Sequence, residues 1–342
     1  MRSELLPLLR CPADGSPLTL EAERQPWIES GTLVCAGQSH RYPIRRGMPY
    51  VYVDDEYWRP KAVEAVGWVN YHKDRNIYDQ TGVDIDFQLP YFPHDPWIDN
   101  ARQFDIALDL IDPRPGMWVL DVGAGRGWAA KHFALRGCNA VAVEINDDDQ
   151  VGLGRSRALM EQAGVTYDAM IADSATLPFA DDSFDVVFAA AALHHTLDLG
   201  RLLANTGRVL RPGGRLVAIN EPCVDDRRDD EEIRRTDMAE ELSYGINETR
   251  PRLDDYRRLL RAANLREDSL FIWQSYDRKI EDLASWSREL GIQPPRGLRG
   301  AITRLLRPVP APAPRDSRLP PLAWSDHLIR ERGGGIIIVA IK

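Results

Sequence analysis

A turn with three glycines directly after an apolar run limits this chain more than any other feature. The run Val119-Leu-Asp-Val-Gly-Ala-Gly-Arg-Gly127 places Gly123, Gly125 and Gly127 between a predicted strand and a predicted helix. Glycines at this point allow a tight turn whose backbone can approach a ligand at a helix N-terminus. The last glycine of a dinucleotide fingerprint is replaced by Trp128. The pattern is G-x-G-x-G, which predicts a nucleotide-type site without the dinucleotide motif.

Strand-like and helix-like stretches alternate after Ala101. This alternation predicts βαβ units and a parallel, doubly wound sheet. The expected fold class is therefore α/β: a Rossmann-like sheet of seven strands, with a small β-rich module at the N-terminus. The expected strands are 117–123, 139–145, 167–173, 184–190, 214–220, 269–275 and 333–342, and the expected helices are 101–111, 128–137, 150–164, 199–210 and 252–264.

Composition divides the chain into five parts. Short strands and turns fill the first part, aromatic residues crowd the second, and the third holds the α/β core. A helix followed by a stretch rich in proline and arginine interrupts the end of the core, and an apolar strand closes it. The predicted boundaries are 1–53, 54–103, 104–276, 277–330 and 331–342.

Charge and cysteine content exclude several classes of protein. The net charge of −9, with only five lysines, disfavours nucleic acid as a partner. No apolar run approaches the ~20 residues of a membrane helix, so no membrane span is expected. The N-terminus lacks the pattern of a signal peptide, and four cysteines are too few for a secreted disulfide scaffold. We therefore expect a cytoplasmic protein with reduced thiols.

Four motifs in order resemble those of the class I S-adenosylmethionine (SAM)-dependent methyltransferases. They are the glycine loop, a carboxylate at the end of the second strand, the segment Ile171-Ala-Asp-Ser-Ala-Thr-Leu-Pro-Phe, and Leu210-Arg-Pro-Gly-Gly before the fifth strand. The resemblance implies SAM as the cofactor, with Glu144 on the ribose hydroxyls, Asp173 at the adenine amine and the Ser174 backbone beside the ring. The implied SAM-binding set is Asp121, Gly123, Ala124, Gly125, Gly127, Glu144, Ile145, Asp173, Ser174 and Ala190.

A general base is needed only if the methyl acceptor is a poor nucleophile, such as a hydroxyl. The candidates are His194 and His195 after the fourth strand and Glu221 after the fifth, because strand ends open onto the ligand crevice. The family often carries this His-His pair without catalytic use, so a structural role for either histidine stays open. No Asn/Asp-Pro-Pro-Tyr motif follows the fourth strand, which favours oxygen or carbon acceptors over planar amines.

The first 50 residues resemble a Trm112-like zinc ribbon. The ending Tyr42-Pro-Ile-Arg-Arg-Gly-Met-Pro-Tyr50 is retained, but Asp14 and Gln38 replace two of the four cysteines. Two thiolates cannot close a structural zinc site, so no bound metal is expected. The set Cys11, Asp14, Cys35 and His40 remains a chemically possible alternative, similar to the finger of ribosomal RNA guanine methyltransferases.

Two segments are candidates for the acceptor side. The aromatic part 54–103 is either a satellite core or a cap over the SAM pocket, with Tyr71 or Tyr78 near the sulfonium. The loop Tyr244-Gly-Ile-Asn-Glu-Thr249 could also reach the crevice. Exposed aromatic residues in the connector would be compatible with a homodimer.

These observations predict an enzyme, a SAM-dependent methyltransferase. Its expected acceptor is a small molecule or glycan, methylated on a hydroxyl oxygen in natural-product or glycan biosynthesis. One alternative is an RNA methyltransferase of the ribosomal RNA guanine type, suggested by the ribbon-like module. A second alternative is a non-catalytic partner protein with the same fold.

Overall fold

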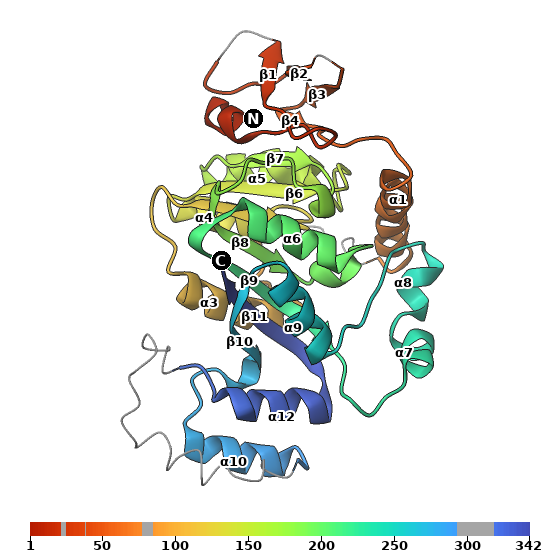
Figure 1. The fold of residues 1–342 in the computed structure, drawn as a ribbon, viewed down its shortest axis with the longest axis vertical. Coiled ribbons are helices and arrows are strands. Elements are labelled where there is room, and N and C mark those ends of the chain that lie inside the picture. Colours follow the sequence, from red (N-terminus) through yellow and green to blue (C-terminus); the bar gives the residue numbers. More distant parts are fainter. Residues whose placement is uncertain (22–24, 38, 77–84, 293–317) are drawn as a thin grey trace.

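The computed structural model of the 342-residue chain contains two sheets (Figure 1). It describes residues 1–21, 25–37, 39–76, 85–292 and 318–342. A four-stranded antiparallel sheet has the order β1-β2-β3-β4, and a seven-stranded sheet has the order β10-β11-β9-β8-β5-β6-β7. The strands are β1 (Leu18–Glu21), β2 (Gly31–Cys35), β3 (Arg41–Arg45), β4 (Met48–Pro49), β5 (Trp118–Val122), β6 (Asn139–Glu144), β7 (Asp168–Ile171), β8 (Phe184–Ala190), β9 (Leu210–Cys223), β10 (Arg266–Ile272) and β11 (Gly334–Ile341).

Helices connect the strands of the larger sheet and precede it. They are α1 (Trp58–Asp74), α2 (Ile85–Gln88), α3 (Trp97–Ile111), α4 (Trp128–Leu135), α5 (Ser156–Ala163), α6 (Leu199–Val209), α7 (Asp230–Asp237), α8 (Ala239–Ser243), α9 (Leu253–Ala262), α10 (Ile280–Glu289) and α12 (Leu322–Arg332). A short 3-10 helix, η1 (Ser3–Leu8), begins the chain.

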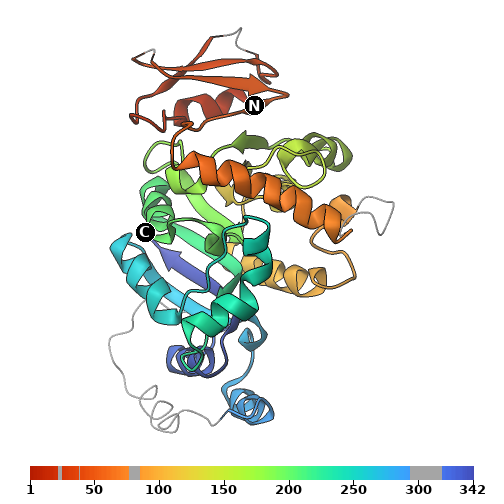
Figure 2. The same cartoon turned by 90° about the vertical axis from the view of Figure 1, so that its right-hand side faces the viewer.

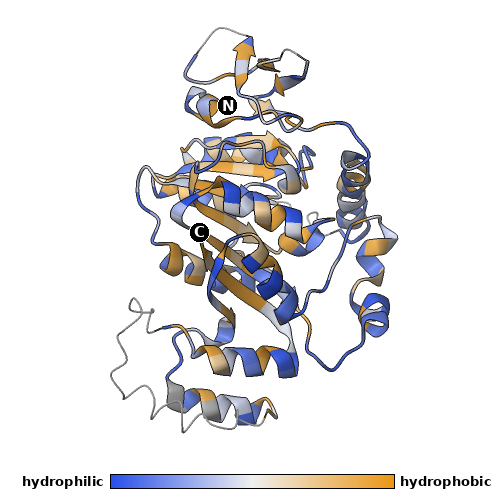
Figure 3. Cartoon of the chain, in the orientation of Figure 1, coloured by the Kyte–Doolittle hydropathy of each residue, from blue (hydrophilic) through white to orange (hydrophobic). Residues whose placement is uncertain are grey.

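The seven-stranded sheet confirms the predicted α/β class. Strands β7, β6, β5, β8 and β9 pair in parallel, whereas β11 runs antiparallel between β9 and β10. Alternate residues of β5 face opposite layers. Val119 packs in the same cluster as Phe104 of α3, and Leu120 packs with Leu203 of α6. Helices therefore cover both faces, which explains why the central strands consist mostly of apolar residues (Figure 3).

One predicted helix begins later than its sequence pattern indicates. The stretch 150–164 forms α5 only from Ser156, after a short 3-10 turn at Leu153–Arg155. A Cβ on Gly152 would lie 2.2 Å from the carbonyl oxygen of Asn146, and one on Gly154 would lie 2.5 Å from that of Asp147. The two glycines allow the chain to fold back on the segment after β6 before the helix begins.

The N-terminal module packs on the outer edge of the large sheet, beside β7. The Val51 amide donates to the Ile171 carbonyl at 2.8 Å, so the end of the module continues the ladder of β7. The Arg2 backbone amide and guanidinium both donate to the buried carboxylate of Asp168, at 2.6 and 2.9 Å. The module and the core therefore share a hydrophobic cluster and a buried ion pair.

The connector contains a helix that the sequence analysis did not predict. Residues 58–74 form α1, which runs along the outside of the core below the module (Figure 2). No helix among the described residues is long and apolar enough to cross a membrane. Part of the predicted Pro/Arg-rich insertion, residues 293–317, lies outside the described residues, as does Tyr78.

Candidate active site

The glycine loop joins β5 to α4 through a left-handed backbone. The φ angles of Gly123, Gly125 and Gly127 are +66°, +52° and +84°. A Cβ on Gly123 would lie 2.5 Å from the Cβ of Ala192, and one on Gly127 would lie 2.7 Å from the hydroxyl of Tyr167. Nothing lies within 4 Å of the Cβ position of Gly125, which borders a cavity. Two glycines are thus required by close packing, and Gly125 leaves space beside its Cα for a ligand.

Asp121 supports this loop from inside the core. Its Oδ2 accepts a hydrogen bond from the Ala130 amide, in the first turn of α4, at 3.1 Å. Burial raises the pKa of this carboxyl to about 7. The Asp121 side chain does not line the cavity. It links the end of β5 to the N-terminus of α4.

Glu144, the last residue of β6, reaches back to the glycine loop. Its Oε2 accepts from the Gly125 amide at 2.9 Å, and its Oε1 accepts from the Ile145 amide at 2.7 Å. Burial raises the pKa of this carboxyl, although both amides oppose the rise. The carboxylate borders the cavity and still has lone pairs for the two hydroxyls of a diol.

Asp173, directly after β7, has one satisfied oxygen and one without a partner. Its Oδ1 accepts from the Ala175 amide at 3.0 Å. Its Oδ2 is buried and has no hydrogen-bond partner among the described residues. The neighbouring residues Ala172 and Ser174 both lie on the cavity wall. The unpaired oxygen is available to accept a hydrogen bond, and an unsatisfied buried acceptor is costly.

The cavity between these strand ends and α1 contains about 960 Å³ of empty space, open solvent included. One face of α1 closes it, because Lys61, Glu64, Trp68 and His72 recur at the spacing of a helix. The Lys61 Nζ donates to Glu64 Oε2 at 2.8 Å and to the His195 carbonyl at 2.9 Å, which fixes α1 against the turn after β8. The other lining residues are Leu89, Trp97, Gly123, Gly125, Arg126, Trp128, Val143, Glu144, Ile145, Asn146, Val151, Ala172, Ser174, Ala191, Ala192, His195 and Thr196.

Of the two adjacent histidines after β8, His195 borders the cavity and His194 does not. Its Nδ1 lies 2.8 Å from the Asn247 carbonyl oxygen and 3.0 Å from Glu248 Oε2. A carbonyl oxygen can only accept, so the proton is assigned to Nδ1 and the lone pair to Nε2. Burial lowers the pKa of this imidazole, which keeps it neutral at pH 7. The Trp68 ring meets the His195 ring edge-on, with centroids 4.9 Å apart.

His194 and Glu221 lie behind this wall. The fully buried Glu221 carboxylate accepts from the amides of Ala192 and Leu193, at 2.9 and 3.0 Å. It also contacts His194 Nδ1 at 2.8 Å. Burial alone would raise the Glu221 pKa, but His194 and the amides outweigh burial and lower it. Burial lowers the pKa of His194 to about 4. Glu221 therefore organises the turn that carries His195.

Two parts of the chain match models of known protein families. Residues 120–218 match the family model described as a methyltransferase domain, and residues 2–47 match the model described as Trm112p-like protein. The chain carries a SAM-dependent methyltransferase domain. The matched range begins in β5 and ends in β9, and it contains the glycine loop, Glu144 and Asp173.

The similarity to curated relatives covers about a third of this chain. The ubiquinone/menaquinone biosynthesis C-methyltransferase UbiE of Dinoroseobacter shibae is 35% identical over 116 residues, which are 34% of this chain and 46% of that protein. An O-methyltransferase of Pyrenophora dematioidea is 34% identical over 131 residues, with the same coverage. The chain thus spans less than half the length of these curated relatives.

A solved structure is similar over more of the chain. The complex between the Haloferax volcanii Trm112 methyltransferase activator and the putative methyltransferase covers 84% of this chain and 98% of that chain. The TM-score is 0.44 at 18% identity.

The structure divides the predicted residues of the methyltransferase domain into two groups. Those on the cavity wall are Gly123, Gly125, Glu144, Ile145, Ser174 and His195, and those beside or behind it are Asp121, Ala124, Gly127, Asp173, Ala190, His194 and Glu221. Beyond β8, the wall is formed by Ala191 and Ala192 instead of Ala190. The second group positions the strand ends and turns that the first group occupies.

The sequence analysis named the aromatic part 54–103 and the loop 244–249 as candidate segments, but it did not single out Lys61, Glu64, Trp68 or Glu248 within them. A helical spacing of three and four residues connects the first three, but nothing in the sequence shows which face of that helix is buried. Tyr71, one of two predicted neighbours of the sulfonium, is not among the lining residues. Its ring packs edge-on against Tyr244 instead, with centroids 5.4 Å apart.

The residues around the cavity fit SAM. The open space beside the Gly125 Cα suits a ligand that approaches the loop closely, Glu144 suits the ribose diol, and the unpaired oxygen of Asp173 suits the adenine amine. Trp68 and Glu64 face the same space and suit a cationic sulfonium.

Proposed function

We propose that this chain transfers a methyl group from SAM to a hydroxyl oxygen of a small-molecule or glycan acceptor. His195 carries the proposal, because it borders the cavity with its Nδ1 engaged and its Nε2 available as a base. A hydroxyl is a weak nucleophile at neutral pH, so its methylation benefits from a neutral imidazole nearby.

Each group then has a defined task. SAM supplies an electrophilic methyl group on a sulfonium. When SAM is bound, its methyl group would pass to the acceptor oxygen, and His195 Nε2 would take up the hydroxyl proton. The resulting imidazolium is stabilised through Nδ1 by the Asn247 carbonyl and the Glu248 carboxylate. The face of α1 with Lys61 and Trp68 excludes water and would hold the acceptor in line with the methyl group. Positioning of the reacting groups is the largest contribution available to such a transfer.

Carbon methylation is the second candidate. The Dinoroseobacter relative is named as a C-methyltransferase of quinone biosynthesis, and the Pyrenophora relative as an O-methyltransferase. Removal of a proton from a phenolic hydroxyl would activate a ring carbon in the same way that it activates the oxygen. His195 would therefore serve either acceptor atom.

The test begins with calorimetric titration of SAM and its demethylated product into the purified chain. Micromolar binding of both supports the cofactor site, and absence of binding would favour the non-catalytic alternative. Incubation with methyl-¹³C SAM and a panel of hydroxylated acceptors follows. The ¹³C shift of the product methyl separates oxygen from carbon transfer. Transfer to RNA alone, with steep salt dependence, would contradict the small-molecule proposal.

A further inference from the structure

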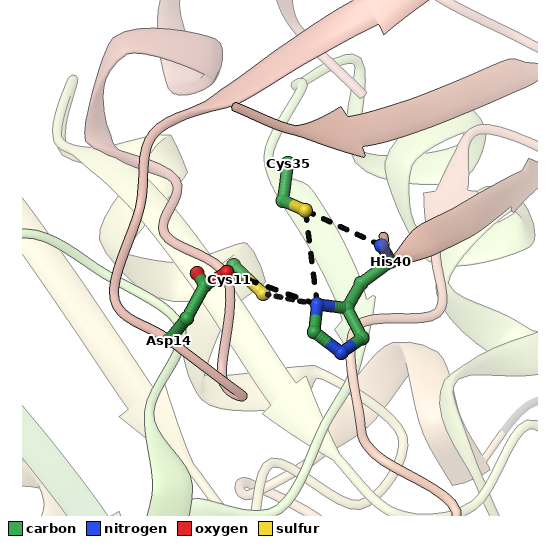
Figure 4. A group of neighbouring side chains, drawn as sticks. All are labelled: Cys11, Asp14, Cys35 and His40. Carbon is green, nitrogen blue, oxygen red and sulfur yellow. Dashed lines mark hydrogen bonds and ion pairs between the residues drawn. The ribbon is translucent and has the colours of Figure 1, made fainter. Parts of the chain in front are cut away.

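Four side chains with metal-binding atoms lie together in the N-terminal module, outside the methyltransferase domain (Figure 4). Cys11 and Asp14 belong to the turn after η1, Cys35 ends β2, and His40 directly precedes β3. The ligand atoms of all four lie within 4.8 Å of one another. Two separate segments of the chain thus converge on one point.

The three distances from His40 match edges of a tetrahedron around a metal ion, and the remaining three ligand pairs lie within 4.8 Å. His40 Nδ1 lies 3.6 Å from Cys11 Sγ, 3.7 Å from Cys35 Sγ and 3.8 Å from Asp14 Oδ2. In tetrahedral zinc sites, bond lengths of about 2.3 Å to sulfur and 2.0–2.2 Å to nitrogen or oxygen give edges of about 3.4 to 3.8 Å. The donors are therefore already spaced as ligands of one small ion.

Hydrogen-bond donors surround the two sulfur atoms. The His40 backbone amide points at Cys35 Sγ from 3.3 Å, and the Ser39 hydroxyl lies 3.5 Å from the same atom. The Tyr42 hydroxyl lies 3.1 Å from Cys11 Sγ. Such outer contacts stabilise thiolates and orient ligands in metal sites. Both cysteines are buried, whereas Asp14 is exposed, so the site is open to solvent on one side.

We propose that Cys11, Asp14, Cys35 and His40 bind one zinc ion. Two thiolates, an imidazole and a carboxylate in tetrahedral arrangement are a donor set that zinc accepts. The sequence analysis expected no metal because two of the ribbon cysteines are replaced. The structure provides two replacement donors. Asp14 stands at one replaced cysteine position, and His40 lies two residues after the other, Gln38. The ion would join the turn after η1 to the hairpin of β2 and β3, and it takes no part in methyl transfer.

The direct test is metal analysis of the full chain, purified from zinc-supplemented medium under reducing conditions. We expect one zinc ion per chain, measured by inductively coupled plasma mass spectrometry. Replacement by Co²⁺ should give thiolate charge-transfer absorption and the visible bands of a tetrahedral ion. Less than one tenth of an ion per chain, an octahedral cobalt spectrum, or a Cys11–Cys35 disulfide in the fresh protein would overturn the proposal.

Variants identify the ligands. Cys11→Ser should reduce bound zinc at least tenfold, whereas Cys138→Ser, which alters a buried thiol elsewhere, should leave it unchanged. Because Cys11→Ser could impair folding, Asp14→Ala provides a second test at an exposed side chain. It should weaken zinc affinity about tenfold or more in competition with a chelator, with an unchanged circular dichroism spectrum. Unaltered zinc affinity in both cluster variants would contradict the assignment.

Discussion

The two walls of the cavity are built in different ways. The wall assigned to SAM comes from the ends of β5, β6 and β7, which follow one another within about 55 residues of sequence. The wall facing it comes from α1 and the turn after β8, and the loop around Glu248 supports that turn through His195; these three segments are far apart in sequence. Local backbone geometry determines the first wall, whereas tertiary packing determines the second.

The largest expected effect is on the second wall. His195→Ala should lower kcat by about 10²- to 10⁴-fold, because it removes the proposed base. Affinity for the demethylated product of SAM should stay within about threefold of the original. Steady-state kinetics and calorimetry measure the two quantities. His94→Ala changes an exposed histidine of the connector and is the matched control. Retained turnover in His195→Ala would assign the proton to another group.

The next effect is on the first wall. Glu144→Ala should weaken SAM binding by about 100-fold, because it removes both charged hydrogen bonds to a diol, each worth about 1.5 kcal/mol or more. Calorimetry measures the change, and Glu161→Ala on the exposed side of α5 provides the control. Unchanged SAM affinity would show that Glu144 supports only the Gly125 amide.

The third prediction separates support from chemistry. Glu221→Gln should destabilise the chain by about 1–3 kcal/mol, because the NH2 group that replaces Oε2 cannot accept from the His194 backbone amide and Nδ1. Urea denaturation measures this change. The affinity of the folded variant for the demethylated product of SAM should be unchanged. A loss of turnover at unchanged stability would instead make Glu221 the base.

The smallest effect is a shift along the pH axis. Because burial lowers the pKa of His195, this residue stays neutral to a pH below the ordinary histidine value of about 6.5. We expect kcat to be flat from pH 8 to 6.5 and to fall only at lower pH, as protonation removes the base. Stopped assays across this range, with protein stability checked at each pH, measure the profile. An acid limb centred above pH 6.5 would indicate a different titrating group.

The contrast also explains what could be predicted from sequence. The alternation of apolar strands and helices predicts the α/β sheet, and the glycine spacing predicts the loop, because both depend on neighbours in sequence. The same reasoning left His194, His195 and Glu221 equivalent. Only the fold shows that Asn247 and Glu248 orient His195 while Glu221 is enclosed behind it. The connector shows no amphipathic pattern clear enough to reveal α1, since the face on the cavity carries Lys61 and Glu64.

The position of the N-terminal module has a consequence for solubility. Strand β7 ends the large sheet, and an uncovered edge strand presents amide and carbonyl groups that can pair with another chain. Here the Val51 amide donates to the backbone carbonyl of Ile171, and Arg2 covers the side-chain carboxylate of Asp168. Removal of residues 1–53 would therefore expose the edge of β7 to pairing with another chain. It would also leave the Asp168 carboxylate without the guanidinium of Arg2. Shortened chains of this kind should aggregate even where every residue around the SAM cavity is retained.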